Sequence, residues 1–115
     1  MCEYASKTIA QREYLFAFRQ LQTIKSAIES QCLCLVYSSC ELKKFAICAI
    51  ETSPVYTYNY VVGIDAAGKP VSLRLRDLQS VTITNENIEL TESMVGKLCD
   101  YLDELYQKEY EECLV

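Results

Sequence analysis

Histidine and tryptophan are both absent from this chain of 115 residues. Without histidine the chain cannot form a Ser-His or Cys-His catalytic pair, and it cannot bind a metal ion through an imidazole. The sequence also lacks a glycine-rich phosphate loop, a dinucleotide-binding glycine fingerprint and an HExxH zinc motif. We therefore expect a protein that is not an enzyme and that uses neither a cofactor nor a metal.

Glycine and proline are scarce, with three and two residues respectively, so most of the chain should form regular structure. Half of the residues are hydrophobic and 23% are charged, which is typical of one soluble globular domain over residues 1–115. No run approaches the roughly 18 apolar residues of a membrane span, and the first residues lack the pattern of a secretory signal. We expect a cytoplasmic protein without a membrane partner.

Seven cysteines are present, an odd number that does not fit a framework of disulfides in a chain without a secretory signal. Structural zinc sites use cysteines two to four residues apart together with a second such pair or with histidines, and this chain has no such set. We interpret Cys32, Cys34 and Cys48 as small apolar residues that are buried in strands.

Residues 6–30 are expected to form a helix, because apolar residues recur there at helical spacing. Leu15 and Phe16 lie off this apolar stripe, which predicts a second buried face. That face would be either the interface of a homodimer or a position wrapped by the rest of the chain. The stripe itself consists of Tyr14, Ala17, Phe18, Leu21, Ile24 and Ile28.

Short strands are expected to follow. Residues 32–38 and 42–52 are such apolar runs that we predict strands buried on both faces or nearly so. Residues 80–85 alternate as a last short strand, and Thr91 opens a helix at 91–112. The buried stripe of this helix is predicted to comprise Met94, Leu98, Tyr101, Leu102, Leu105 and Tyr106.

A hairpin is predicted between these strands, with its turn at residues 65–69 (DAAGK). Asp at the first turn position and Gly at the fourth are typical of a type I turn closed by a glycine bulge. This turn places Val61 opposite Leu73 and directs both, together with Leu75, toward the core. A loop of two or four residues would shift this register.

On the other face, the same register places Tyr60 opposite Arg74 and Tyr58 opposite Arg76. We call these four residues the tyrosine–arginine face and expect it to point to solvent. The overall architecture is then α+β: a small, strongly bent antiparallel sheet of four to five strands over residues 31–84. Such a sheet resembles a partly open SH3-like (Sm-like) barrel, here flanked by N- and C-terminal helices.

This layout resembles the WYL domain, a family of Sm/SH3-like β-barrels found in bacterial transcription regulators and CRISPR-associated proteins. The matching segments are residues 25–28 (KSAI), 33–37 (LCLVY), 59–61 (NYV) and 73–78 (LRLRDL), within a region of about 21–84. The family tryptophan is replaced by asparagine, and we expect no helix-turn-helix domain of the kind that often precedes the barrel, because residues 4–30 have the pattern of one helix. The resemblance implies a stand-alone regulatory or accessory module.

The resemblance also implies that basic and aromatic residues on this strand pair bind a ligand, often a nucleotide or nucleic acid. Tyr58 and Tyr60 would stack on bases, and Arg74 and Arg76 would bind phosphate oxygens. The alternative is that these are ordinary cross-strand surface pairs, which contribute roughly 0.2–1 kcal/mol each without any ligand. The net charge of −5 also opposes general affinity for nucleic acid.

Acidic residues are concentrated in the expected C-terminal helix, which allows two interpretations. Such a run is usually a solvated face. Alternatively, it could dock on the basic groove of a nucleic-acid enzyme, as a protein-interaction inhibitor such as a phage-encoded anti-CRISPR protein would. The acidic residues in and near this helix are Glu89, Glu92, Asp100, Asp103, Glu104, Glu109, Glu111 and Glu112.

Overall fold

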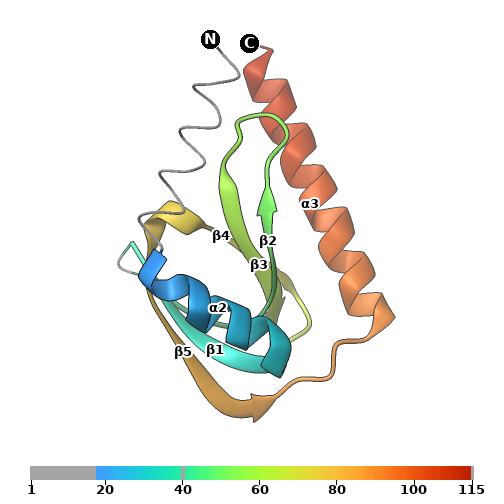
Figure 1. Cartoon of the computed structure of the whole chain (residues 1–115). Helices are drawn as coiled ribbons and strands as arrows, with labels where there is room; N and C mark the ends of the chain where they lie inside the picture. The colour runs from blue at the N-terminus through green and yellow to red at the C-terminus, as the bar shows by residue number, and fades with distance from the viewer. Residues whose placement is uncertain (1–17, 40, 115) are drawn as a thin grey trace.

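Five antiparallel strands form one open sheet in the order β4-β3-β2-β1-β5 (Figure 1). The computed structural model describes residues 18–39 and 41–114, so Leu15 and Phe16 of the expected interface lie outside the described residues. The elements are α2 (Phe18–Ser30), β1 (Cys32–Ser38), β2 (Glu41–Thr52), β3 (Asn59–Asp65), β4 (Pro70–Arg74), the 3₁₀ helix η1 (Leu75–Asp77), β5 (Leu78–Asn87) and α3 (Glu92–Cys113).

The predicted α+β architecture is confirmed. Each strand pairs with its neighbour along the chain, except that β5 returns to pair with β1. The sheet therefore has two edges, β4 and β5, and the half that contains β1 and β5 bends away from the direction of β2 and β3 (Figure 1). In the described part of the chain, neither helix is long and apolar enough to cross a membrane.

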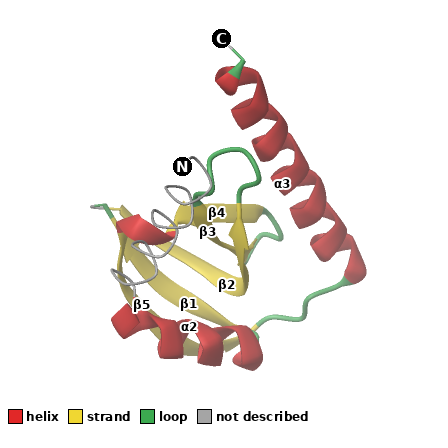
Figure 2. Cartoon of the chain, turned by 45° about the horizontal axis from the view of Figure 1, so that its top comes forward, coloured by secondary structure: helices red, strands yellow, loops and turns green. Residues whose placement is uncertain are grey.

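The two helices pack on opposite faces of the sheet (Figure 2). Side chains of adjacent strand residues point to opposite faces, and Val61 and Val62 accordingly belong to two different hydrophobic clusters. We call these the α2-side cluster and the α3-side cluster. The α2-side cluster contains Ile24, Ala27, Cys34, Val36, Phe45, Ile47, Val61, Leu75 and Val81. The α3-side cluster is built on Tyr60, Val62, Ile64 and Leu98.

Strand β1 is less buried than the sequence predicts. Val36 is fully buried, but Leu35 and Tyr37, on the other face, are exposed. The prediction of burial on both faces is therefore wrong for β1. The physical reason is that α3 packs mainly against β3 and β4, so it leaves the same face of β1 uncovered.

Gly63 allows two strands to approach closely at the centre of the sheet. It pairs with Ile47, next to an irregularity between Ile47 and Ala49 in β2. A Cβ atom at position 63 would lie 1.9 Å from the carbonyl oxygen of Ala46, so only glycine fits there. This contact fixes β3 against β2 and thereby positions the residues that precede Gly63 on β3.

Candidate functional site

The turn at residues 65–69 has the geometry that its sequence predicts. The Gly68 amide donates to the carbonyl oxygen of Asp65 at 3.0 Å, and the Asp65 amide donates to that of Lys69 at 2.9 Å. The Asp65 carboxylate accepts the amides of Ala67 and Lys69, both at 2.9 Å. Gly68 has a φ of 82°, a left-handed conformation that glycine adopts without steric cost. The local chemistry of this turn therefore sets the register of the hairpin.

The predicted register is confirmed in its central part. Val61 pairs with Leu73 and Tyr60 pairs with Arg74. The guanidinium carbon of Arg74 lies 3.6 Å from the centre of the Tyr58 ring, a cation–π contact. Three members of the tyrosine–arginine face, Tyr58, Tyr60 and Arg74, are thus brought together.

Arg76 does not join them, and its predicted pairing with Tyr58 is wrong. Strand β4 ends at Arg74, and residues 75–77 form the 3₁₀ helix η1. Leu75 is fully buried in the α2-side cluster, and the side chain of Arg76 is 57% exposed, with its Nε atom 3.6 Å from Asp77. The burial of Leu75 therefore turns the chain before Arg76 can lie opposite Tyr58.

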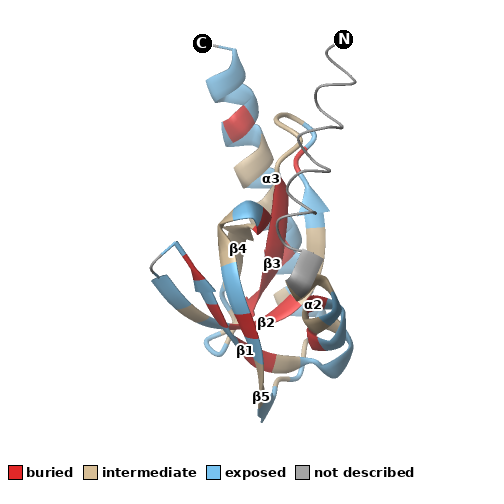
Figure 3. Ribbon diagram, turned by 60° about the vertical axis from the view of Figure 1, so that its left-hand side comes forward, coloured by how far each residue is buried: buried red, intermediate tan, exposed pale blue. Residues whose placement is uncertain are grey.

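The tyrosine–arginine face is covered by α3, so the expectation that it points to solvent is also wrong. Tyr60 is only 9% exposed, and Tyr58 and Arg74 are half-buried. Figure 3 shows β3 as a buried strand, and α3 packs against it. The predicted apolar stripe of α3 is confirmed, because its residues pack against the cluster that contains Tyr60 and Val62.

A buried carboxylate lies where α3 meets this face. Glu109 is only 5% exposed, and both of its oxygens accept hydrogen bonds. The hydroxyl of Tyr60 donates to Oε1 at 2.7 Å, and the hydroxyl of Ser53 donates to Oε2 at 2.5 Å. Glu109 stands in the sequence among acidic residues typical of a solvated face, so its burial was not predicted. Its position four residues after Leu105 and three after Tyr106, on the apolar stripe, was the available signal.

The loop between β2 and β3 holds Ser53 in place for this contact. The Ser53 amide donates to the carbonyl oxygen of Tyr58 at 2.8 Å, and its own carbonyl accepts the Thr57 amide at 3.0 Å. Its hydroxyl oxygen also accepts the amides of Val55 and Tyr56, at 3.2 and 3.4 Å. Ser53 is fully buried, so its hydroxyl is held with its proton directed at Glu109.

Burial and hydrogen bonding keep the phenols of this site protonated. The pKa of Tyr60 lies well above its ordinary value, first because burial disfavours the phenolate and then because the hydroxyl donates to Glu109. The nearby positive charge of Arg74 opposes this rise. Burial also raises the pKa of Tyr106. Tyr60 is consequently a hydrogen-bond donor at neutral pH, which suits the recognition of an oxyanion.

A second polar contact joins α3 to the edge of the sheet. The hydroxyl groups of Ser72 on β4 and Tyr101 on α3 lie 2.8 Å apart and share a hydrogen bond. The helix begins after Thr91, whose hydroxyl accepts the amide of Met94 at 3.2 Å. A hydroxyl–hydroxyl contact with β4 and a hydroxyl–carboxylate contact with β3 therefore hold α3 on the sheet, in addition to its apolar stripe.

The outer side of α3 is strongly acidic. The helix contains seven acidic and two basic residues, which leaves nine of each sign in the rest of the chain, so α3 accounts for the whole net charge of −5.

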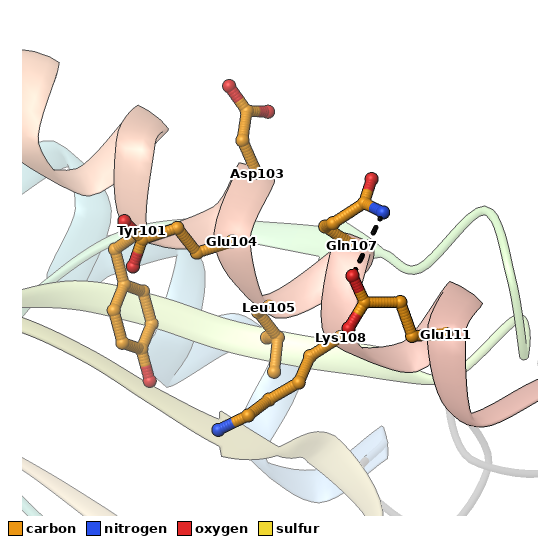
Figure 4. A pocket seen from close by; sticks show the side chains of 7 residues that line it. All are labelled: Tyr101, Asp103, Glu104, Leu105, Gln107, Lys108 and Glu111. Atoms are coloured by element: carbon orange, nitrogen blue, oxygen red, sulfur yellow. Dashed lines mark hydrogen bonds between the residues drawn. The ribbon is translucent and has the colours of Figure 1, made fainter.

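An open cavity of about 590 Å³ lies along this helix (Figure 4). Its lining consists of Tyr101, Asp103, Glu104, Leu105, Gln107, Lys108 and Glu111.

The predicted burial of the strand cysteines is confirmed only for Cys34, whereas Cys32 and Cys48 are half-buried. Burial raises the pKa of the Cys34 and Cys48 thiols, so both remain protonated at neutral pH. In the described ranges no group of three or more cysteine, aspartate or glutamate side chains could hold a metal ion.

Comparison with known proteins gives no relative from which a function could be transferred. No family model matches the chain, no curated protein matches it, and no solved structure matches it.

Proposed function

We propose that this protein is a non-enzymatic regulatory or accessory module of the WYL type that binds an anionic ligand through Tyr58, Tyr60 and Arg74. The proposal is supported by the hydrogen bonds that this site donates to the carboxylate of Glu109. Ser53 and Tyr60 already bind a carboxylate beside the tyrosine–arginine face. A site that binds one oxyanion of the chain itself has the donors needed for the phosphate of a ligand.

The surrounding side chains suit a nucleotide or a short single strand. Arg74 lies over the ring of Tyr58 and offers a planar fork of donors to phosphate oxygens. Tyr56 and Tyr58 have their ring centres 5.1 Å apart, which provides aromatic surface next to that fork. Stacking of a base on such a ring contributes about 1–3 kcal/mol. These residues therefore combine a phosphate donor with a stacking platform.

The arrangement of the elements supports the WYL-type relationship. A helix precedes a five-stranded sheet whose last strand returns to the first, as expected for a half-open barrel of this kind. Ala27, in the segment that resembles the family signature, is fully buried against the sheet. The segment at 73–78 spans the end of β4, η1 and the start of β5, and Leu75 is its buried anchor.

The test is a titration of a fluorescent oligothymidylate of about ten nucleotides, at low salt, with wild type, Arg74→Ala and Arg76→Ala. We expect Arg74→Ala to weaken binding about ten-fold or more, because it removes the donors on the face. Arg76→Ala removes the same charge from an exposed position outside the face, so it should change binding less than about three-fold. Equal losses in both variants would contradict the proposal.

A second candidate function rests on the charge of α3. Because this helix carries the whole net negative charge, its outer side could dock on a basic groove of a nucleic-acid enzyme, as an inhibitor of the anti-CRISPR type would. The test is co-purification with such a basic effector. Binding should survive Arg74→Ala and be lost when Asp100, Asp103, Glu104 and Glu111 are neutralised to amides; the reverse pattern would exclude this candidate.

A further inference from the structure

Glu109 occupies the place that the proposed ligand needs. Its carboxylate accepts hydrogen bonds from the hydroxyl groups of Ser53 and Tyr60, and Arg74 lies directly opposite Tyr60 on the neighbouring strand. An external phosphate could reach these donors only after Glu109 has left them. The inference that follows rests on the proposed function, and it concerns how access to the same site is controlled.

Helix α3, which carries Glu109, has few fully buried side chains. Of its 22 residues only Leu98 and Glu109 are buried, and the others that face the sheet are half-buried. Tyr110, one position beyond Glu109, is 52% exposed, and residues 111–114 are exposed as well. A segment with so few buried contacts opens at a lower free energy than the sheet does.

The two ends of α3 differ in how they are attached. At its start, the amide of Ile88 donates to the carbonyl oxygen of Gln31 at 3.0 Å, and Ile88, Leu90 and Met94 pack on the α3-side cluster. Near its end, the contacts come from the half-buried Leu105 and Tyr106 and from Glu109, and every described residue after Glu109 is exposed. Fraying of the last turns would therefore uncover the site while the start of the helix stays in place.

We infer that α3 is a removable cover in which Glu109 competes with an incoming phosphate for the hydroxyl groups of Ser53 and Tyr60, the latter being the cross-strand partner of Arg74. In the closed state the carboxylate of Glu109 satisfies the buried hydroxyl groups. In the open state the phosphate of a nucleotide or single strand replaces it. Binding of the ligand and release of the C-terminal half of α3 are then one coupled equilibrium.

Gly96 provides a control for this equilibrium, because it lies in the first turns of α3, which stay in place in both states. It lies within α3, and a Cβ atom built at this position meets nothing within 4 Å. Glycine weakens a helix interior relative to alanine without any packing role here. Gly96→Ala should therefore stabilise the helix equally in the closed and open states and change ligand binding less than about two-fold, whereas markedly weaker binding would contradict release of the C-terminal half alone.

The decisive experiment compares Glu109→Gln with Glu104→Gln, using the labelled oligothymidylate and inorganic phosphate as a competitor. Both variants remove one negative charge from α3, but Glu104 is exposed. We expect Glu109→Gln to bind the oligonucleotide at least about ten-fold more tightly than wild type, while Glu104→Gln stays within about two-fold. Competition by phosphate alone would support replacement of the Glu109 carboxylate by another oxyanion, and its absence would contradict that replacement.

Hydrogen exchange gives a readout that a merely structural role of Glu109 would not change. Saturating oligonucleotide should accelerate exchange of the amides at 105–112 in wild type while it slows exchange in β3 and β4. An ordinary ligand would slow exchange in both regions. Slower exchange in α3 on binding would overturn the inference even if Glu109→Gln were too unstable to purify.

The outcomes separate the inference from the proposed function. If wild type and Glu109→Gln bind equally well, and both lose affinity with Arg74→Ala, the binding site exists and the removable cover is wrong. If neither protein binds the oligonucleotide or phosphate, the proposed function itself is wrong, and the cover has nothing to control. Tighter binding by Glu109→Gln together with faster exchange in α3 supports both.

Discussion

The two faces of the sheet are held by different kinds of interaction. The α2-side cluster consists entirely of hydrophobic side chains, among them the fully buried Phe45 and Ile24. On the other face, α3 is attached through an apolar stripe, with Leu98 buried and the others half-buried, and in addition through the hydroxyl–carboxylate contacts at Glu109. The first attachment is non-directional and depends on buried area, whereas the second depends in addition on a few donors and acceptors.

This difference separates the stabilising part of the molecule from the part that can exchange partners. Opening a hydrophobic cluster costs free energy, because no external molecule of the same shape takes the place of the packed side chains. A carboxylate bound by hydroxyl groups can be replaced by another oxyanion with little change in the bonds made. The α3 side is therefore the face on which regulation by a ligand is physically feasible.

The largest effect is expected from a substitution on the α2 side. Phe45→Ala should reduce the free energy of unfolding by about 3–5 kcal/mol, because it leaves a cavity among fully buried residues. Urea denaturation followed by circular dichroism measures this loss. Leu42→Ala is the matched control on the same strand, since Leu42 is 57% exposed, and it should cost no more than about 0.5 kcal/mol. Equal losses would show that the α2-side cluster is not the main core.

The hairpin register was predictable from the sequence because its determinants are local. Asp65 and Gly68 specify the turn through hydrogen bonds within five residues, and the turn alone then pairs Tyr60 with Arg74. Arg76 was not predictable in this way. Its position depends on Leu75, which enters the α2-side cluster and ends the strand, and that choice is made by packing rather than by the local sequence.

The cover over the site was harder to predict than the site itself. Composition cannot distinguish Glu109 from the exposed acidic residues beside it. Only its helical phase, in line with Leu105 and Leu98, indicates burial, and a buried carboxylate requires partners that lie 49 and 56 residues away along the chain. Contacts over such distances depend on the tertiary arrangement of α3, which the sequence pattern does not specify.

A smaller effect on stability is expected from the hydrogen bond between Tyr60 and Glu109 on the α3 side. Tyr60→Phe and Glu109→Gln should each reduce the free energy of unfolding by about 1.5–3 kcal/mol, since each removes or weakens a buried hydrogen bond to a charged group. The double variant should lose less than the sum of the two, because the same contact is broken in both single variants. Urea denaturation of the four proteins gives this coupling energy.

The hydrogen bond between the uncharged side chains of Ser72 and Tyr101 is the comparison for this double-mutant cycle of Tyr60 and Glu109. Ser72→Ala and Tyr101→Phe should each cost about 0.5–1.5 kcal/mol, as expected for a hydrogen bond between uncharged groups. A coupling at Ser72–Tyr101 as large as that at Tyr60–Glu109 would mean that the charge of Glu109 contributes nothing to holding α3.

The smallest effect is expected at alkaline pH, and it also distinguishes the two faces. Because the pKa of Tyr60 is raised in the folded state, the folded protein keeps this proton at a pH where the unfolded chain releases it. Its contribution to stability is complete below about pH 10, the ordinary pKa of tyrosine, and declines above it by about 1.4 kcal/mol per pH unit. Urea denaturation at about pH 8.5, 10 and 11 under reducing conditions measures this decline.

Tyr60→Phe isolates the contribution of the α3 side. The thiols of Cys34 and Cys48 also have raised pKa values, so they weaken both proteins equally from about pH 9 upward. The difference in stability between wild type and Tyr60→Phe should therefore stay constant up to about pH 10 and shrink above it, because only wild type still has the phenol to lose. A difference that remains constant to pH 11 would mean that Tyr60 ionises as readily in the folded protein as in the unfolded chain, and thus that α3 does not shield it from water.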